Sequence, residues 1–297
     1  HFFTPENYEF RQASEQFSLE KFAAAVLFFK GFLDLRVSYK RTALNPAQLF
    51  LISFVVIILG GTLLLSLPGA THEGIGLLDA LFTATSAVCV TGLIVVDTAT
   101  HFTFFGQSIL LFLIQIGGLG ILTFVSYFSY FFKGEISYEK QIAINQINSS
   151  GAIGKELGLL KSILIITLSI EAFSALLIFY NTDPAAFTSV SERVFFSVFH
   201  AVSAFCNAGF STLSDSLMQG GFQFNYGLQL AIILTFILGG LGFPIVSNIV
   251  SYLSYKAKGV FSFFDKPNYR PWVLTLNSRI ALITTIVLTI GGTLVFF

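Results

Sequence analysis

The sequence predicts an all-α membrane protein built from repeated units, each a spanning helix, a short re-entrant segment and a second spanning helix. Three observations predict this fold. Of the 297 residues, 54% are hydrophobic and 11% are charged, whereas about 25% of the residues in a soluble domain carry charge. Long apolar runs alternate with short apolar segments that end at a glycine, and the same motifs return along the chain. Successive units would share one orientation, so a pseudo-symmetry axis along the membrane normal would relate them.

The apolar runs set the predicted elements, because about 20 apolar residues are needed to cross the hydrocarbon core of a bilayer. Five runs reach that length, at residues 47–67, 107–131, 161–180, 227–250 and 279–297. They predict an N-terminal cytoplasmic or interfacial segment, two complete units, two cytoplasmic loops and the first helix of a truncated third unit. The predicted bounds are 1–46 for the N-terminal segment, 47–131 and 161–250 for the units, 132–160 and 251–278 for the loops, and 279–297 for the last helix.

The N-terminal segment lacks the pattern of a signal peptide, since no basic stretch followed by an apolar one stands at its start. Residues 18–36 mix Phe and Leu with Lys21, Lys30 and Asp34, a composition typical of a helix at the membrane interface. The chain begins at His1 rather than at Met, so we expect natural sequence to precede it.

Lysine and arginine predict the orientation. If the N-terminus is cytoplasmic, all but one of the 16 basic residues fall on the cytoplasmic side, and only Arg193 lies outside. Cytoplasmic loops carry an excess of Lys and Arg, so we predict a multi-pass protein of the cell membrane with a cytoplasmic N-terminus. Acidic residues on its outer side would either raise the local cation concentration or be ordinary solvated loop charges. The acids there are Glu73, Asp79, Asp97, Asp183, Glu192 and Asp215.

The repeats are visible in three pairs of motifs. The first pair is Ser86-Ala-Val-Cys-Val-Thr-Gly92-Leu and, 117 residues later, Ser203-Ala-Phe-Cys-Asn-Ala-Gly209-Phe. The second is Ile116-Gly-Gly-Leu-Gly120 with Leu238-Gly-Gly-Leu-Gly242, and the third is Leu59-Gly-Gly-Thr-Leu63 with Ile290-Gly-Gly-Thr-Leu294. Two complete units and the start of a third leave an open ring, so we expect the chain to be part of a longer protein.

The two short segments have the chemistry of pore loops. Irregular backbone inside a bilayer must be buried in protein or face a water-filled cavity. Gly92 and Gly209 allow a positive φ, which can turn carbonyl groups toward a central axis, where they replace the hydration shell of a monovalent cation. Short helices predicted at 79–90 and 194–206 would direct their partly negative C-terminal ends to the same place. A single such glycine is often only a helix C-cap, but two equivalents with the same flanking residues favour a pore.

The motifs resemble those of one transporter family. Three stretches are similar to the first two pore units of the Trk/Ktr/HKT family of potassium transporters: Thr85-Ser-Ala-Val-Cys-Val-Thr-Gly92-Leu, Gln115-Ile-Gly-Gly-Leu-Gly120 and Phe199-His-Ala-Val-Ser-Ala-Phe-Cys-Asn-Ala-Gly209-Phe-Ser. The similarity extends from about Gln48 to the end of the chain, and Leu274-Thr-Leu-Asn-Ser-Arg279 resembles the start of the family's third unit.

The resemblance implies four units around one pore, with Gly92 and Gly209 as two of four filter glycines. The ion-binding residues of the selectivity filter would be Val90, Thr91, Gly92 and Leu93, together with Asn207, Ala208, Gly209 and Phe210. Family members with serine at the first filter glycine tend to admit sodium, so Gly92 favours potassium, held at the filter residues only. The resemblance also implies a homodimer and, in many bacterial members, a cytoplasmic nucleotide-binding regulatory subunit. No bound cofactor is expected; membrane lipid and the potassium ion, as substrate, are the other expected partners.

Glu171 lies in the middle of a predicted span, where an ionisable group is costly. It is either a candidate coupling residue or a carboxyl that is hydrogen-bonded between packed helices. His200 and Cys206 could act as a catalytic base and nucleophile only if they lay on the same helix face. Their separation of six residues places them about 120° apart around the helix, which favours a packing role for His200.

The remaining motifs favour structural roles. Cys89 and Cys206 occupy matching positions in the two short segments, which favours packing over a disulfide. The histidines are scattered along the chain, so a metal site is not indicated. The glycine-rich stretches at 117–120 and 239–242 indicate close helix packing rather than hinges, although Pro244 leaves room for a kink.

These observations predict potassium transport through a filter of backbone carbonyls, and they predict that the chain is not an enzyme and binds no nucleic acid. One alternative is a sodium-permeable or sodium- or proton-coupled cation transporter of the same family. Alternatives of another class are an intramembrane enzyme, which would need a nucleophile and a base on facing helices, and a non-conducting scaffold.

Overall fold

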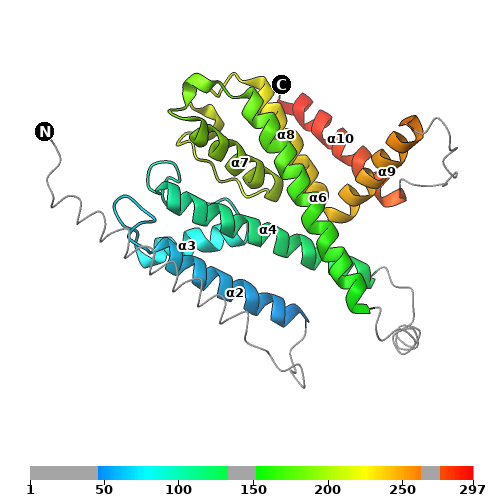
Figure 1. Ribbon diagram of the computed structural model, residues 1–297, viewed down its shortest axis with the longest axis horizontal. Coiled ribbons are helices and arrows are strands. Elements are labelled where there is room, and N and C mark those ends of the chain that lie inside the picture. Colours follow the sequence, from blue (N-terminus) through cyan, green and yellow to red (C-terminus); the bar gives the residue numbers. More distant parts are fainter. Residues whose placement is uncertain (1–45, 133–151, 262–274, 297) are drawn as a thin grey trace, which may run out of the picture. The chain divides into compact units, whose positions relative to one another are not determined.

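A computed structural model describes residues 46–132, 152–261 and 275–296, and every regular element in these ranges is a helix (Figure 1). The α-helices are α2 (Pro46–Leu65), α3 (Leu77–Val88), α4 (Phe104–Phe132), α6 (Ala152–Asn181), α7 (Val190–Cys206), α8 (Tyr226–Leu241), α9 (Phe243–Phe261) and α10 (Leu276–Phe296). Two short 3₁₀ helices follow α6 and α7, at η1 (Pro184–Ala186) and η2 (Ser216–Met218). The predicted all-α fold class is therefore confirmed.

The chain divides into two compact units, His1–Ser53 and Phe54–Phe297, and the site described below lies wholly in the second. Residues 1–45, 133–151 and 262–274 fall outside the described residues, and with them most of the predicted interfacial segment and the centres of both predicted cytoplasmic loops. Helices α6 and α9 occupy the remaining parts of those loops, since α6 already begins at Ala152 and α9 continues to Phe261.

Three described helices are long and apolar enough to cross a membrane, at Phe104–Thr123, Lys161–Asn181 and Leu276–Val295. A fourth candidate is the bent pair Tyr226–Leu241 and Phe243–Ser254. The apolar helices Phe50–Leu65 and Leu77–Val88 are shorter. These segments lie on the five predicted runs and on the first of the two predicted short helices.

The first repeat consists of α2, α3 and α4, which pack closely through small residues. A Cβ added to Gly61 of α2 would lie 2.8 Å from a methyl carbon of Leu113 on α4 and 3.4 Å from the Cβ of Ala84 on α3. Small residues at such contacts let helix backbones approach one another in a membrane. Helix α3 is buried along one face, which carries Ala80, Thr83, Ala84, Ser86, Ala87 and Val88.

The second repeat consists of α6, α7 and α8, and α7 starts at a well-capped end. Ser189 Oγ accepts a hydrogen bond of 3.2 Å from the N–H of Glu192. The Glu192 carboxylate in turn accepts hydrogen bonds from the hydroxyl and the N–H of Thr188, at 2.6 and 2.9 Å. These bonds, led by the one from the Thr188 hydroxyl, lower the pKa of Glu192 below its ordinary value. Reciprocal capping of this kind satisfies N–H groups that a helix start otherwise leaves unpaired.

Arg193 fastens α7 to the end of α6. Its guanidinium donates to the carbonyl oxygens of Phe179 and Thr182 and to the Thr182 hydroxyl, the last two at 2.7 and 3.0 Å. It also lies over the Phe179 ring, 4.1 Å from the centroid. A cation at a helix C-terminus pairs with carbonyl groups that have no partner within the helix, so the one basic residue predicted outside has a structural role.

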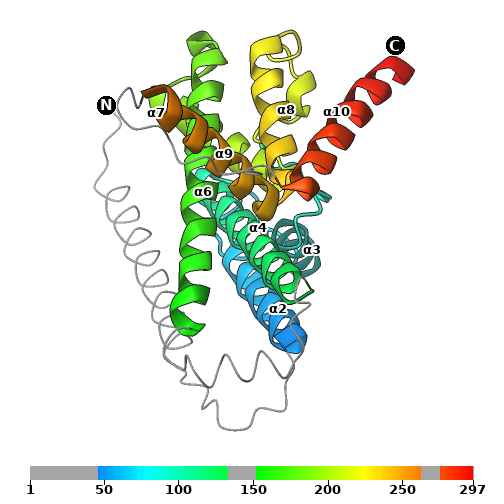
Figure 2. The ribbon, with the colours of Figure 1, turned by 90° about the vertical axis from the view of Figure 1, so that its right-hand side faces the viewer.

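The two repeats differ at the glycine-rich stretches. Helix α4 runs unbroken through Gly120 to Phe132, whereas α8 ends at Leu241 and α9 leaves at an angle of 111° (Figure 2). Between α8 and α9, Gly242 has φ 78° and ψ 156°, a conformation open essentially to glycine. Pro244 has no N–H to donate to the carbonyl four residues before it, at Gly240, and it suits the first turn of the next helix. The run at 227–250, which was predicted as one crossing, is therefore broken at Gly242. The kink that the sequence allowed near Pro244 is present.

Candidate functional site

The first glycine-ended segment is tied to the end of its own short helix. Helix α3 ends at Val88, and the N–H of Thr91 donates back to the carbonyl oxygen of Ser86 at 2.9 Å. The Ser86 hydroxyl donates a hydrogen bond of 2.7 Å to the carbonyl oxygen of Leu93. Gly92 therefore lies in a loop whose two ends are held by one serine.

The second segment repeats both of these bonds. The N–H of Ala208 donates to the carbonyl oxygen of Ser203 at 2.7 Å, and the Ser203 hydroxyl donates to the carbonyl oxygen of Phe210 at 2.7 Å. Ser203 follows Ser86 by the same 117 residues that separate Gly209 from Gly92. The repeat found in the sequence is therefore a repeat of local structure.

The backbone has the same unusual conformation in both loops. Positive φ angles occur at Val90 (57°) and Gly92 (75°), and at the equivalent Asn207 (60°) and Gly209 (73°). Because a positive φ is rare for a residue with a Cβ, its occurrence at both Val90 and Asn207 marks a constrained site.

The two loops lie against each other. A Cβ built on Gly92 would collide with the carbonyl oxygen of Ala208 and would lie 3.3 Å from the Cα of Gly209. Both loops follow directly from helix C-termini, which carry partial negative charge. All eight residues predicted for the filter therefore lie in one region.

The side chains of the eight residues differ in exposure. Ala208 and Phe210 are buried, Val90 and Gly92 are partly buried, and the others, Thr91, Leu93, Asn207 and Gly209, are exposed. Phe210 and Ala208 belong to one hydrophobic core with Val88, Leu113 and Phe199. This core joins the two repeats directly behind the loops.

Sequence reasoning did not single out Ser86 and Ser203 as functional residues. Both begin the quoted motifs and stand at equivalent positions seven residues before the carbonyl that they bind. The signal in the sequence is a hydroxyl residue at the same position of both predicted short helices. A buried hydroxyl needs a hydrogen-bond partner, so this repeat could have identified the two serines.

His200 packs against the second loop instead of acting as a catalytic base. It is buried; its Nδ1 lies 2.9 Å from the carbonyl oxygen of Phe196, and its Nε2 lies 3.0 Å from the hydroxyl of Ser211. The prediction that His200 serves packing is confirmed. Its bond to Ser211 adds a second tie between α7 and the chain that leaves the loop.

The glycine-rich stretches pack directly on the ends of the short helices. A Cβ on Gly117 of α4 would collide with the carbonyl oxygen of Val88, and one on Gly239 of α8 would collide with that of Phe205. Each contact joins a repeat's second long helix to the last turn of its own short helix. The interpretation as close packing is confirmed for both glycines.

The two cysteines are free, and they stand at the ends of α3 and α7. Cys206 packs on Gly118, where a Cβ would collide with its Sγ, whereas Cys89 is exposed. Matching positions therefore do not give the two thiols the same surroundings.

Glu171 lies in α6, only 5% exposed, and is joined to the first repeat. Its Oε1 accepts a hydrogen bond of 3.1 Å from Nε2 of Gln115 on α4. The sequence left two interpretations of Glu171 open, a coupling residue or a carboxyl that is hydrogen-bonded between packed helices. The structure shows the hydrogen bond between packed helices.

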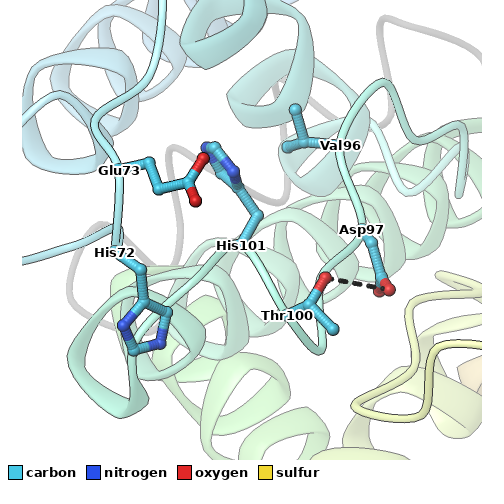
Figure 3. A pocket seen from close by; sticks show the side chains of 6 residues that line it. All are labelled: His72, Glu73, Val96, Asp97, Thr100 and His101. Atoms are coloured by element: carbon cyan, nitrogen blue, oxygen red, sulfur yellow. Dashed lines mark hydrogen bonds between the residues drawn. The ribbon is translucent and has the colours of Figure 1, made fainter.

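A polar pocket of about 290 Å³ lies on the loops that flank α3, on the side predicted to face outward (Figure 3). Its lining residues are His72, Glu73, Val96, Asp97, Thr100 and His101. Burial opposes ionisation of Asp97, but hydrogen bonds from Ala99, Ser214 and Thr100 outweigh it and lower the pKa of this carboxyl. Among the described residues, no three His, Cys, Asp or Glu side chains are grouped so that they could hold a metal ion.

Comparison with known proteins identifies the family of this chain. Residues 16–296 match the model of the TrkH family, described as cation transport proteins. The chain belongs to the TrkH family. This family consists of transport proteins rather than enzymes, and with its apolar helices the chain is a membrane protein.

Curated relatives agree with the family. The chain is 38% identical over 212 residues to the Ktr system potassium uptake protein B of Bacillus subtilis, covering 71% of this chain and 47% of the relative. It is 38% identical over 262 residues to the potassium/sodium uptake protein NtpJ of Enterococcus hirae, covering 86% and 53%. It is 35% identical over 255 residues to the Ktr protein B of Vibrio alginolyticus, covering 84% and 51%. The chain thus spans about half the length of the curated relatives it matches.

Proposed function

We propose that the full-length protein carries potassium across the cell membrane through a filter to which this chain contributes two of four segments. The observation that carries the proposal is the pair of equivalent loops, each with positive φ at a glycine and at the residue two before it, lying against one another at helix C-termini. Carbonyl oxygens in such loops can replace the hydration shell of potassium.

The serine hydrogen bonds indicate different roles for the carbonyl groups within each segment. The carbonyl oxygens of Leu93 and Phe210 each accept a hydrogen bond from a serine hydroxyl. In our proposal these two residues close the segments, and the carbonyls of Val90, Thr91 and Gly92 coordinate potassium. Their equivalents Asn207, Ala208 and Gly209 do so in the second repeat.

Two open glycine faces support further units. Gly118 is covered by Cys206 from the next repeat, but among the described residues a Cβ on the equivalent Gly240 would have only the Asn207 amide nearby, at 3.9 Å. Gly61 is covered by α4, but a Cβ on its equivalent Gly292 of α10 would meet no described residue within 4 Å. Gly240 lines a groove of about 460 Å³ whose other lining residues belong to α8, α9 and α10. We propose that the rest of a third unit fills this groove.

The relatives' names support the substrate and the setting. Two relatives are named potassium uptake proteins of Ktr systems, and a third is named for both potassium and sodium. In our proposal the protein is a homodimer of the cell membrane with a cytoplasmic N-terminus, regulated by a cytoplasmic nucleotide-binding subunit. Light scattering of the purified protein, with and without such a subunit, tests the assembly.

Uptake into vesicles tests the transport itself. The full-length protein is reconstituted, and entry of radioactive rubidium is measured against an opposing excess of potassium or sodium. We expect uptake that potassium suppresses far more strongly than sodium does. Equal suppression by both ions would favour the sodium-permeable alternative, and absence of flux with every regulator would contradict the proposal.

A sodium- or proton-coupled mode is the second candidate, and the buried carboxyl of Glu171 favours it. Coupling through ionisation of Glu171 predicts that Glu171→Gln abolishes the dependence of uptake on the driving ion gradient. Unchanged rate and unchanged gradient dependence in this variant would remove the coupling role.

A further inference from the structure

One turn of α4 touches three other elements behind the filter loops. Gly117 lies against the carbonyl of Val88, at the end of α3, and Gly118 lies against Cys206, at the end of α7. Two residues earlier, Gln115 donates its hydrogen bond to Glu171 on α6. Residues 115–118 therefore contact the starting points of both filter loops and a buried carboxyl at once.

The glycines on this turn leave no side chain that could absorb a movement. At Gly117 and Gly118 the α4 backbone is in direct contact with Val88 and Cys206, and each filter loop begins at the next residue, Cys89 or Asn207. Because packed interiors transmit strain instead of deforming locally, a small rotation of α4 would displace both loops.

The hydrogen bond between Gln115 and Glu171 opposes such a rotation. Glu171 is buried, so the loss of its partner would leave a polar group without compensation in an apolar span. The pair thus fixes the rotation of the α4 turn on which Gly117 and Gly118 contact the two short helices.

We propose that Gln115 and Glu171 are a positioning pair that sets the spacing of the two filter loops and thereby the ion selectivity of the pore. Neither residue touches the ion; both act through the α4 turn. The inference rests on the proposed cation transport and adds to it a determinant of selectivity that lies outside the filter.

The hydrogen bond can be removed, preserved or reversed by substitution. Gln115→Leu and Glu171→Leu remove it, whereas Glu171→Gln keeps an acceptor oxygen for Gln115. The double variant Gln115→Glu/Glu171→Gln reverses donor and acceptor. The matched control is Ser174→Ala, because Ser174 lies about one turn along α6 from Glu171 and accepts a buried hydrogen bond of 2.9 Å from Thr235 on α8.

The experiment measures uptake of potassium and sodium by the full-length protein in vesicles, normalised to inserted protein. We expect Gln115→Leu and Glu171→Leu to raise the sodium-to-potassium uptake ratio by roughly three- to tenfold, as for loss of a buried hydrogen bond that holds a site. Glu171→Gln and the reversed double variant should stay within about twofold of the wild-type ratio, and Ser174→Ala should lower thermal stability with an unchanged ratio.

Each contrary result has a distinct meaning. An active wild type with unchanged ratios in Gln115→Leu and Glu171→Leu overturns the positioning role alone, and so does a reversed variant that resembles the single leucine variants. If Glu171→Leu does not insert, Gln115→Leu and the reversed variant still decide. A wild type without cation flux overturns the proposed function and this inference together.

Discussion

The hydroxyl of Ser203 donates a 2.7 Å hydrogen bond to the carbonyl oxygen of Phe210 across the second filter loop, as Ser86 does to Leu93 in the first. Each bond joins residues seven positions apart on either side of a loop that contains the proposed filter glycine. The N–H groups of Thr91 and Ala208 donate to the carbonyl oxygens of the same two serines, so hydroxyl and backbone bonds together hold each loop against the end of its short helix.

Ser203→Ala should lower stability by about 1 kcal/mol and reduce discrimination between potassium and sodium, because the Phe210 carbonyl loses its hydrogen bond to α7. Thermal unfolding in detergent and competition uptake in vesicles measure the two effects. Ser197→Ala is a suitable control, since its hydroxyl bonds only to the α7 backbone, at Arg193. Equal loss of discrimination in both variants would contradict the role of Ser203.

The two filter glycines should respond unequally to alanine. Both have a positive φ, which costs an L-residue about 1–2 kcal/mol. Only Gly92→Ala also drives a Cβ into the Ala208 carbonyl; at Gly209 the nearest atom is the Gly92 Cα, 3.5 Å away. We expect Gly92→Ala to abolish potassium uptake and Gly209→Ala to leave a measurable fraction. A more active Gly92→Ala variant would argue against the loop contact.

Gly239→Ala should destabilise the protein by about 2 kcal/mol or more, because the added methyl group would overlap the Phe205 carbonyl. Gly220→Ala in the loop before α8 provides the control, because a Cβ there would meet nothing within 4 Å in the described residues. Thermal stability of the two variants in the same detergent compares them. Equal melting temperatures would show that α8 and α7 are not packed as described.

Arg193→Lys should cost about 1–3 kcal/mol of stability and leave ion selectivity unchanged. A lysine ammonium cannot reproduce the fork that binds two carbonyl oxygens and a hydroxyl at the end of α6. The measurement pairs thermal unfolding with the potassium-to-sodium uptake ratio. A changed ratio at normal stability would instead place Arg193 on the ion path.

Asp97 should make stability depend on acid. Its pKa is lowered in the folded protein, so the stabilisation is present above the unfolded pKa and is lost as the pH falls through the folded one. The difference in melting temperature between wild type and Asp97→Asn should therefore shrink as the pH falls below about 4. A difference that stays constant down to acid pH would show that the hydrogen bonds to Asp97 do not depend on its charge.

The sequence alone determined the helical membrane fold, the repeat and the two glycine-ended loops in which we propose the filter. Apolar runs long enough to span a bilayer leave the backbone few options besides helix, and Gly92 and Gly209 could be paired by counting because their flanking residues also repeat. The family resemblance then pointed to the eight loop residues, which the structure brings together.

Only the tertiary structure decided the partners of individual side chains. The break at Gly242 depends on a local competition between an apolar run and Pro244, which composition does not resolve. The bond from Gln115 to Glu171 joins residues 56 positions apart. The atoms that a Cβ on Gly92 or Gly118 would collide with belong to the second repeat. Such contacts depend on how whole helices pack, and a one-dimensional pattern records which face of a helix is apolar but not which neighbour it meets.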